Sequence, residues 1–506
     1  MNAKDIMFSK LSDVVGEAHL TTVREKLDTY STDQSFEAGI TPRYAVFPQN
    51  AQQISEIVRL ANEQRIPIVP KSSAISLYGG ALPTEGGILL DLKRMDQILE
   101  VNDKNWYAVI EPGVTFQQLN SHLLKYGLRV AKPLLEPPSA SVISTYLERV
   151  PAVTATDFVY GMEHVISYCV VAPSGEIFTV GHPPLENTPA SAPDGPGLNF
   201  YRIFQGAQGT LGIVTWMVIR VLPRPTSRKA FFFPSGSIEK AIEIIRCVQK
   251  KELGLECFAL NRFNMAAGLI SVSENQAMSL RKGEYIGSRP IPAWTADQYQ
   301  EFQELKSSLP PWTTVVCLSA AGPLPDEKIA YQEIDLKEAV SAVGASPEPT
   351  VGGFAALDAV VLDELELPWR MQKRYGYKGA CHPIMFSSPP DRVAEFHMTV
   401  SRTVQEFTYP QEDVGIYLLP MERARAFYCS YDLHCNPNEP GESLQARDLF
   451  DRLSDVLVGD GAFFDRPYGK WASVVYSRAG NYSEYLRRIK TELDPNNVMN
   501  PGKLCF

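Results

Sequence analysis

The sequence predicts an α+β protein with more than one domain. At 506 residues the chain is longer than one hydrophobic core supports. Strand-like apolar runs alternate with short amphipathic helices as far as about residue 221, and longer helices follow a Pro- and Arg-bearing linker at 222–230. The chain is 44% hydrophobic and 21% charged, a globular composition that excludes large-scale disorder.

The first part of the chain alternates strands with helices. A helix beginning near Asn50 places Ile54, Ile57 and Val58 on one face, between the strands of "RYAVF" and "RIPIVP". A second helix ends at Gly127. Further strands are expected at 86–92 and 107–113, the second helix at 115–127, and a hairpin at 164–181.

The second part predicts longer helices between strands from 231 to about 405. A Pro-rich zone at 287–312 is expected to be a loop, and an amphipathic helix is expected at 441–458. The sequence shows no internal repeat and no low-complexity tract.

Charge and cysteine usage exclude several classes of protein. The net charge of −10 disfavours a nucleic-acid-binding protein. No apolar stretch reaches the ~20 residues of a membrane span, and the N-terminal residues lack a secretory apolar region. The eight cysteines form no C-x-x-C pair, which predicts reduced thiols in a cytoplasmic protein. The seven histidines lack metal-ligand spacing, so no metal is expected.

The stretch "PKSSAISLYGGALP" (70–83) follows an apolar run and combines small residues with a Tyr-Gly-Gly turn. Small side chains let backbone N–H groups approach a phosphate closely. A flexible surface loop between two strands explains the same composition, and the stretch alone leaves both interpretations open.

Four stretches, in order, resemble the flavoprotein family of vanillyl-alcohol oxidase and p-cresol methylhydroxylase. They span nearly the whole chain and are 73–122, 160–181 ("YGMEHVISYCVVAPSGEIFTVG"), 201–225 ("YRIFQGAQGTLGIVTWMVIRVLPRP") and 493–503 ("LDPNNVMNPGK"). The resemblance implies a PCMH-type FAD-binding domain of two α+β subdomains over 1–225. It also implies a substrate cap domain over 226–460, built on an antiparallel sheet, and a segment at 461–506 that returns to the FAD domain.

The resemblance also implies which residues bind FAD. The loop after residue 70 would lie along the pyrophosphate, the segment after 140 along the isoalloxazine and ribityl chain, and the turn at 209–215 against the adenosine. The residues implied are Lys71, Ser72, Ser73, Ala74, Ile75, Ser76, Gly79, Ser141, Thr145, Glu148, Gly212, Ile213 and Val214.

Three residues match catalytic positions of the family. Tyr78 would lie beside the substrate, Glu136 near flavin N5, and Arg466 near flavin N1, where it would also bind FAD and hold a substrate anion. Two departures matter: "PPSAS" replaces a glycine-rich turn after Glu136, and Asp465 stands where the family has a tyrosine. The structural alternatives are a packed aromatic for Tyr78 and a solvated carboxylate for Glu136.

"YGYKGACHPIMFSSPP" (375–390) matches the cap region that carries covalent flavin in some members, and His382 falls near that position. Covalent attachment through His382 and a structural histidine both remain open; Tyr375 or Tyr377 could serve instead. Arg374 and its neighbours Arg370 and Lys378 form either a basic pocket for a carboxylate or a solvated face.

The resemblance implies an FAD-dependent oxidoreductase that takes a hydride from a benzylic or otherwise activated carbon. The first hypothesis is a 4-hydroxybenzyl or p-alkylphenol substrate, whose electrons pass from the flavin to O2 or an acceptor protein. The protein is expected to form homo-oligomers. The alternatives are a 2-hydroxy-acid dehydrogenase of the D-lactate or glycolate type, and a flavin-binding subunit without its own substrate.

Overall fold

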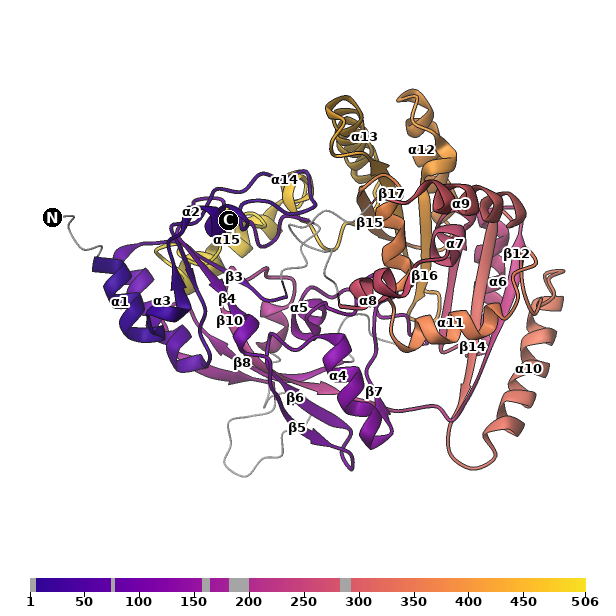
Figure 1. Ribbon diagram of the computed structural model, residues 1–506, viewed down its shortest axis with the longest axis horizontal. Helices are drawn as coiled ribbons and strands as arrows, with labels where there is room; N and C mark the ends of the chain where they lie inside the picture. The colour runs from indigo at the N-terminus through magenta and orange to yellow at the C-terminus, as the bar shows by residue number, and fades with distance from the viewer. Residues whose placement is uncertain (1–5, 74–77, 157–163, 182–199, 283–292) are drawn as a thin grey trace.

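A computed structural model gives the structure of the protein over residues 6–73, 78–156, 164–181, 200–282 and 293–506. Figure 1 shows the elements before residue 225 on one side and those of the second part on the other, with the C-terminal elements back beside the first group. The mixed α+β class is confirmed. The domain bounds 1–225, 226–460 and 461–506 stay predictions.

The first sheet has four strands in the order β1-β2-β4-β3, with β2 and β3 both parallel to β4. The apolar faces of α1 and α3 bury their side chains against it. Helix α3 begins where the Asn50 side chain accepts a hydrogen bond from the Gln53 N–H. The elements are α1 (Ile6–Val15), β1 (Leu20–Thr21), α2 (Arg24–Asp28), β2 (Tyr44–Val46), α3 (Ala51–Gln64), β3 (Ile68–Lys71) and β4 (Ile88–Asp91).

The second sheet has five antiparallel strands in the order β5-β6-β10-β8-β9. A separate apolar core joins it to α4 and α5. Its elements, with the two-stranded pair β7 and β11, are β5 (Ile98–Asn102), β6 (Tyr107–Ile110), α4 (Phe116–Leu123), β7 (Leu128–Arg129), α5 (Val142–Leu147), β8 (Val165–Val171), β9 (Ile177–Val180), β10 (Ile213–Arg220) and β11 (Leu222–Pro223).

The third sheet has six strands in the order β12-β14-β13-β16-β17-β15, and all neighbours are antiparallel. Its strands and helices share the largest apolar core. The elements are β12 (Ser227–Ser235), α6 (Ile238–Lys250), β13 (Glu256–Asn261), α7 (Arg262–Leu269), α8 (Glu274–Lys282), α9 (Ala296–Ser308), β14 (Trp312–Ala320), α10 (Pro325–Ser341), α11 (Leu357–Glu366), β15 (Ala380–Ser388), α12 (Val393–Glu406), β16 (Gly415–Met421), β17 (Ala426–Cys435) and α13 (Pro440–Gly459).

Helix α9 corrects the loop predicted at 287–312. The helix is fixed by a capping box, in which Thr295 and Gln298 each bond the other's backbone N–H. The sequence prediction gave the prolines at 290 and 292 more weight than this capping signal.

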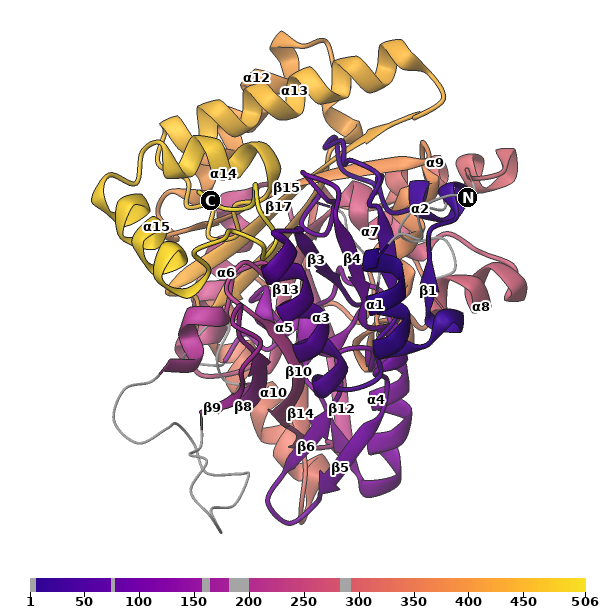
Figure 2. The same cartoon turned by 90° about the vertical axis from the view of Figure 1, so that its left-hand side faces the viewer.

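The chain after α13 returns to the first sheet through α14 (Gly469–Tyr476) and α15 (Asn481–Leu493), as Figure 2 shows. Met499 forms a parallel bridge with Ile68 of β3. Lys503 Nζ donates to the Gly79 carbonyl at 2.8 Å, and Asn500 Nδ2 donates to the Gln208 carbonyl at 2.6 Å. Residues 490–503 therefore brace the loop that follows β3.

Among the described residues, no helix combines the length and apolarity that crossing a membrane requires.

Candidate functional site

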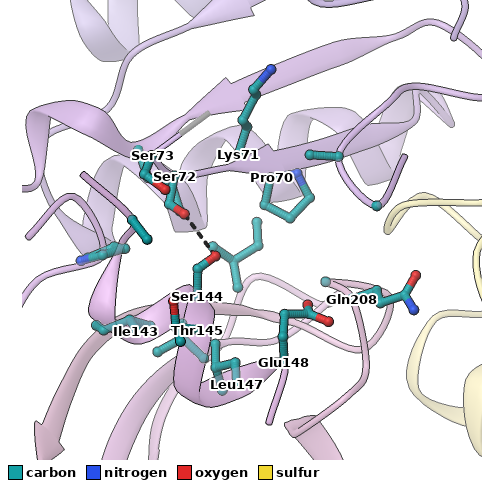
Figure 3. A pocket seen from close by; sticks show the side chains of 18 of the residues that line it. Pro70, Lys71, Ser72, Ser73, Ile143, Ser144, Thr145, Leu147, Glu148 and Gln208 are labelled. Carbon is teal, nitrogen blue, oxygen red and sulfur yellow. Dashed lines mark hydrogen bonds between the residues drawn. The ribbon is translucent and has the colours of Figure 1, made fainter. Parts of the chain in front are cut away.

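A cavity lies between the end of β3, helix α5 and the start of β10 (Figure 3), and we call it the larger cavity to distinguish it from the smaller one beside it. It spans about 1250 Å³ including its open mouth. Its lining residues are Pro70, Lys71, Ser72, Ser73, Tyr78, Gly80, Ala81, Leu92, Pro112, Glu136, Ala140, Ile143, Ser144, Thr145, Leu147, Glu148, Val150, Phe204, Gln208, Gly209, Gly212, Ile213, Val214 and Tyr468.

Small and hydroxyl-bearing residues dominate one wall of this cavity. Ser72 Oγ donates to Ser144 Oγ at 3.1 Å across it, whereas Lys71 points away from Ser144, with Nζ 5.2 Å from the Tyr30 ring centre (Figure 3). On the opposite wall a Cβ added to Gly212 would lie 2.6 Å from Val170 Cγ1. Small residues and closely approaching backbone suit a phosphate-bearing cofactor, so the residues present fit FAD.

At its inner end the cavity is lined by four ionisable side chains. The Tyr78 and Tyr468 rings stack with their centres 5.2 Å apart, and Tyr468 Oη donates to Glu148. Burial raises the pKa of Glu148, which its hydrogen bond with Tyr468 partly offsets. Burial likewise raises the pKa of Glu136, opposed by the Arg466 and Arg374 charges.

A narrow second cavity, the smaller cavity, shares Tyr78, Glu136 and Val150 with the larger one. It lies against one face of the six-stranded sheet, which we call the inner face. Besides the shared residues its lining is Pro133, Leu134, Leu135, Pro151, Arg374, Pro383, Met385, Tyr417, Tyr428 and Ser430. This lining is mainly apolar with a few polar groups, a composition typical of small-molecule sites.

Arg466 is not among the residues that line either cavity, but it contacts two residues of the smaller one. Its Nη2 donates to Tyr428 Oη at 3.1 Å and lies 3.4 Å from Met385 Sδ, while Tyr78 Oη lies 3.2 Å from the same sulfur. Burial raises the pKa of Tyr428 to about 12, although the Arg466 charge lowers it. Arg466 and Tyr78 therefore converge on Met385, and Arg466 also bonds Tyr428.

The structure brings most of the predicted site residues to the larger cavity. Those that line it are Lys71, Ser72, Ser73, Tyr78, Glu136, Thr145, Glu148, Gly212, Ile213 and Val214. Ala74, Ile75 and Ser76 lie outside the described residues. Gly79 and Ser141 are not among the lining residues. The Ser141 hydroxyl caps α5, accepting from the Ser144 N–H at 3.1 Å and donating to the Pro112 carbonyl at 2.6 Å.

His382 does not line either cavity. Side chains alternate along β15, so His382 faces away from Pro383 and Met385, which line the smaller cavity. Its ring stacks on Phe36 with centres 3.7 Å apart, and burial lowers its pKa to about 3. The structure thus places His382 in a packed site and gives covalent attachment through it no support.

Sequence reasoning missed Tyr428. Phe427, Cys429 and Tyr431 of the same strand lie on the opposite face of the sheet. The available signal was period-2 alternation: once Met385 is on the cavity side, its register with Ser430 puts Tyr428 there too.

Comparison with known proteins identifies a matching family model and two sequence relatives. Residues 42–181 match the family model described as "FAD binding domain". Glycolate oxidase subunit GlcD of Bacillus subtilis is 31% identical over 220 residues, covering 43% of this chain and 44% of that protein. The mitochondrial D-lactate dehydrogenase [cytochrome] of Arabidopsis thaliana is 26% identical over 309 residues, covering 60% and 52%. The chain thus spans about half the length of these relatives.

A solved structure, of p-cresol methylhydroxylase with substrate bound, superposes with a TM-score of 0.80 at 19% identity, covering 99% of this chain and 96% of that one. This likeness extends the fold over both parts of the chain. Residues 42–181 thus match an FAD-binding domain, the cavity fits the cofactor FAD, and the likeness shows that the whole chain shares the fold of p-cresol methylhydroxylase.

Proposed function

We propose that the protein is an FAD-dependent oxidoreductase that abstracts a hydride from a benzylic or otherwise activated carbon of a 4-hydroxybenzyl or p-alkylphenol-type substrate. The observation that carries this proposal is the smaller cavity, which shares Tyr78 and Glu136 with the larger one and has three tyrosines in its lining. Aromatic and apolar walls with a cation at the edge suit a small phenol.

The chain's own residues supply the recognition of a phenol. Arg466 and Tyr428 already share a hydrogen bond, and together they would hold a phenolic oxygen. The buried guanidinium favours the phenolate, whose negative charge pushes electron density toward the departing hydride. Bound FAD supplies the hydride acceptor. Glu136, with its raised pKa, would take up at its carboxylate the proton that the substrate loses when the hydride leaves.

Oxidation of a small 2-hydroxy acid is the second candidate. Arg374 lines the smaller cavity and offers a guanidinium donor that can bind a carboxylate oxygen. The two sequence relatives, a glycolate oxidase subunit and a D-lactate dehydrogenase, also favour a 2-hydroxy acid as the substrate. This candidate leaves the Arg466–Tyr428 pair without a substrate group.

Anaerobic flavin absorbance tests both candidates in one experiment. The purified protein is mixed in turn with 4-hydroxybenzyl alcohol, p-cresol and D-lactate, and flavin bleaching is followed. Bleaching by a phenol supports the leading proposal, and bleaching by D-lactate alone supports the second. Bleaching by none of them contradicts both. Oxygen uptake with the reducing substrate then separates dioxygen from a protein acceptor.

Cytoplasmic location and self-association also stay proposals. Cell fractionation tests the first, and size-exclusion chromatography with light scattering tests the second.

A further inference from the structure

Two arginines lie at opposite ends of one row of side chains on the inner face. Tyr428, Ser430 and Asp432 are alternate residues of β17 and so share that face. Arg466 bonds Tyr428 at one end, and Arg374 Nε lies 3.2 Å from Asp432 Oδ2 at the other. A strand rises about 3.3 Å per residue, so the two ends are roughly 13 Å apart along the backbone. The smaller cavity lies against this row.

Arg374 is fully buried and held in place by its neighbours. Its Nη1 donates to the Met371 carbonyl at 2.7 Å and its Nη2 to Tyr375 Oη at 3.3 Å. These contacts account for one hydrogen on each terminal nitrogen, and the Cys381 side chain is a further hydrogen-bond partner of the guanidinium. Asp432 is held by Asn264 Nδ2 at 3.1 Å. A rigid guanidinium with a remaining donor on a cavity wall can bind a carboxylate oxygen.

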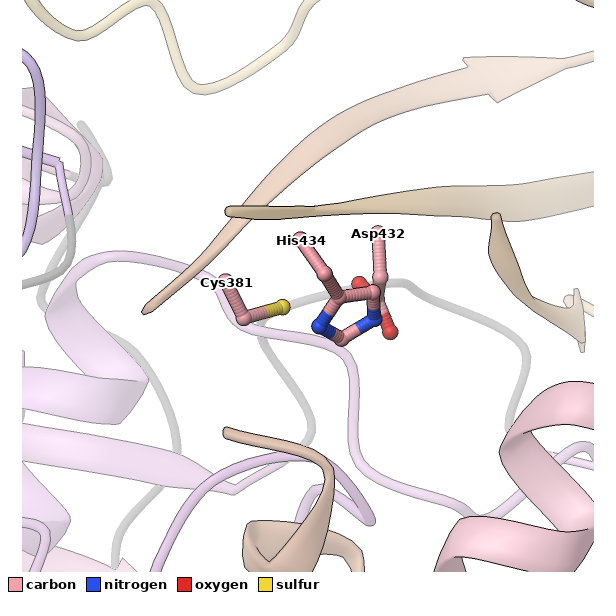
Figure 4. Close-up of side chains that lie close together, drawn as sticks. All are labelled: Cys381, Asp432 and His434. Atoms are coloured by element: carbon pink, nitrogen blue, oxygen red, sulfur yellow. The ribbon is translucent and has the colours of Figure 1, made fainter. Parts of the chain in front are cut away.

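Cys381 and His434 lie beside Asp432 at this end of the row. Figure 4 shows the three side chains, whose sulfur, nitrogen and oxygen atoms lie within 4.8 Å of one another. Burial raises the pKa of the Cys381 thiol and lowers that of His434, so both are uncharged near neutral pH. Burial also raises the pKa of Asp432, the Arg374 charge opposes that shift, and the contact between the two fixes the guanidinium at the end of the row.

A third polar group lies between the two arginines. Tyr417 pairs in register with Ser430 in the middle of the row and lines the smaller cavity. Its hydroxyl is buried and has no hydrogen-bond partner among the described residues. A buried polar group left unpaired costs about 1–3 kcal/mol, so a ligand group is expected to complete it.

We propose that the substrate is an aromatic 2-hydroxy acid that carries a phenolic hydroxyl, with its carboxylate on Arg374, its alcohol on Tyr417 and its phenol on Arg466 and Tyr428. This inference rests on the proposed function and unites its two candidates, because the reacting carbon is both benzylic and adjacent to a carboxylate. The C–H bond breaks with its electron pair as a hydride to bound FAD, the O–H proton goes to Glu136, and a 2-keto acid forms.

Each simpler substrate leaves part of the site unused. A p-alkylphenol engages Arg466 and Tyr428 but leaves the remaining Arg374 donor and the Tyr417 hydroxyl unpaired. D-Lactate engages Arg374 and Tyr417 but does not reach Tyr428. Sites built to hydrogen-bond a substrate group discriminate strongly against analogues that lack it.

The test compares three probes on the wild-type holoenzyme: the 4-hydroxymandelate enantiomers, 4-hydroxybenzyl alcohol and D-lactate. We expect kcat/KM for flavin reduction to be at least about tenfold higher for one 4-hydroxymandelate enantiomer, the factor of a charge-assisted hydrogen bond. The variant Arg374→Met with Asp432→Asn removes both buried charges together and should lose more activity on 4-hydroxymandelate than on 4-hydroxybenzyl alcohol. Arg370→Gln, outside the smaller cavity, is the matched control and should keep the preference.

The possible outcomes distinguish a failure of the further inference from a failure of the proposed function. If 4-hydroxybenzyl alcohol or D-lactate reduces the flavin as efficiently as the better 4-hydroxymandelate enantiomer, the further inference is refuted while the proposed function stands. If neither phenols nor hydroxy acids reduce it, the proposed function itself fails. Should the double variant lose bound FAD, the wild-type comparison alone decides.

Discussion

Replacing Tyr428 by phenylalanine tests the least expected feature of the site. The change removes the hydroxyl that accepts from Arg466 Nη2 at 3.1 Å and leaves the aromatic ring that lines the smaller cavity. Hydrogen bonds to charged groups contribute about 1.5–3 kcal/mol, so kcat/KM for a phenolic substrate should fall about 10- to 100-fold. FAD content should not change, because Tyr428 is not among the residues lining the larger cavity.

The same strand offers a matched control. Tyr431 is equally buried, but it faces the other side of the sheet, where its ring stacks on Phe386 with centres 6.0 Å apart. Tyr431→Phe also removes a tyrosine hydroxyl, but from the face opposite the cavity. It should leave kcat/KM within about twofold of wild type, because no contact with a reacting group is lost. The assay is anaerobic stopped-flow reduction of the flavin with 4-hydroxybenzyl alcohol. Equal losses in both variants, or none in Tyr428→Phe, would refute the assignment of Tyr428 to the substrate.

Four further outcomes are expected. Arg466→Ala should abolish most turnover while FAD is retained, as absorbance spectra and steady-state rates will show. Activity should fall as pH drops through the Glu136 pKa, which lies above the ordinary 4.5 because of burial, since a protonated carboxyl cannot accept the substrate proton; Glu136→Gln should remove that acid limb of the pH–rate profile. His382→Ala should not change the fraction of flavin that remains with acid-precipitated protein. Gly212→Ala should lower the flavin-to-protein absorbance ratio, because the new Cβ meets Val170 at 2.6 Å and displaces the cavity wall.

The sequence was sufficient for the elements whose signals are local. Helix α3 follows its Asn50 cap, and the strands around it show the expected apolar runs. The loop predicted at 287–312 failed because proline content was weighed above the capping box of α9, which is an equally local signal. A better balance of the two would have found the helix.

The site was harder to predict, because it depends on which face a side chain occupies. His382 and Tyr428 lie on paired strands, and the register between β15 and β17 decides that one faces helices and the other the cavity. The Arg466–Tyr428 bond joins residues 38 positions apart, a separation at which no periodicity of a single element carries information. The motifs led to residues most of which line the larger cavity, whereas none of them pointed to Tyr428.

The bracing of the loop after β3 by residues 490–503 has a consequence for biosynthesis. Lys503 reaches Gly79 across 424 positions of sequence. At roughly 5–20 residues per second, a ribosome needs on the order of 20 to 85 s to synthesise the chain from Gly79 to Lys503. During that interval Gly79 lacks this contact. Any stabilisation that the contact gives to the chain around the cofactor cavity is therefore gained only after Lys503 has been made.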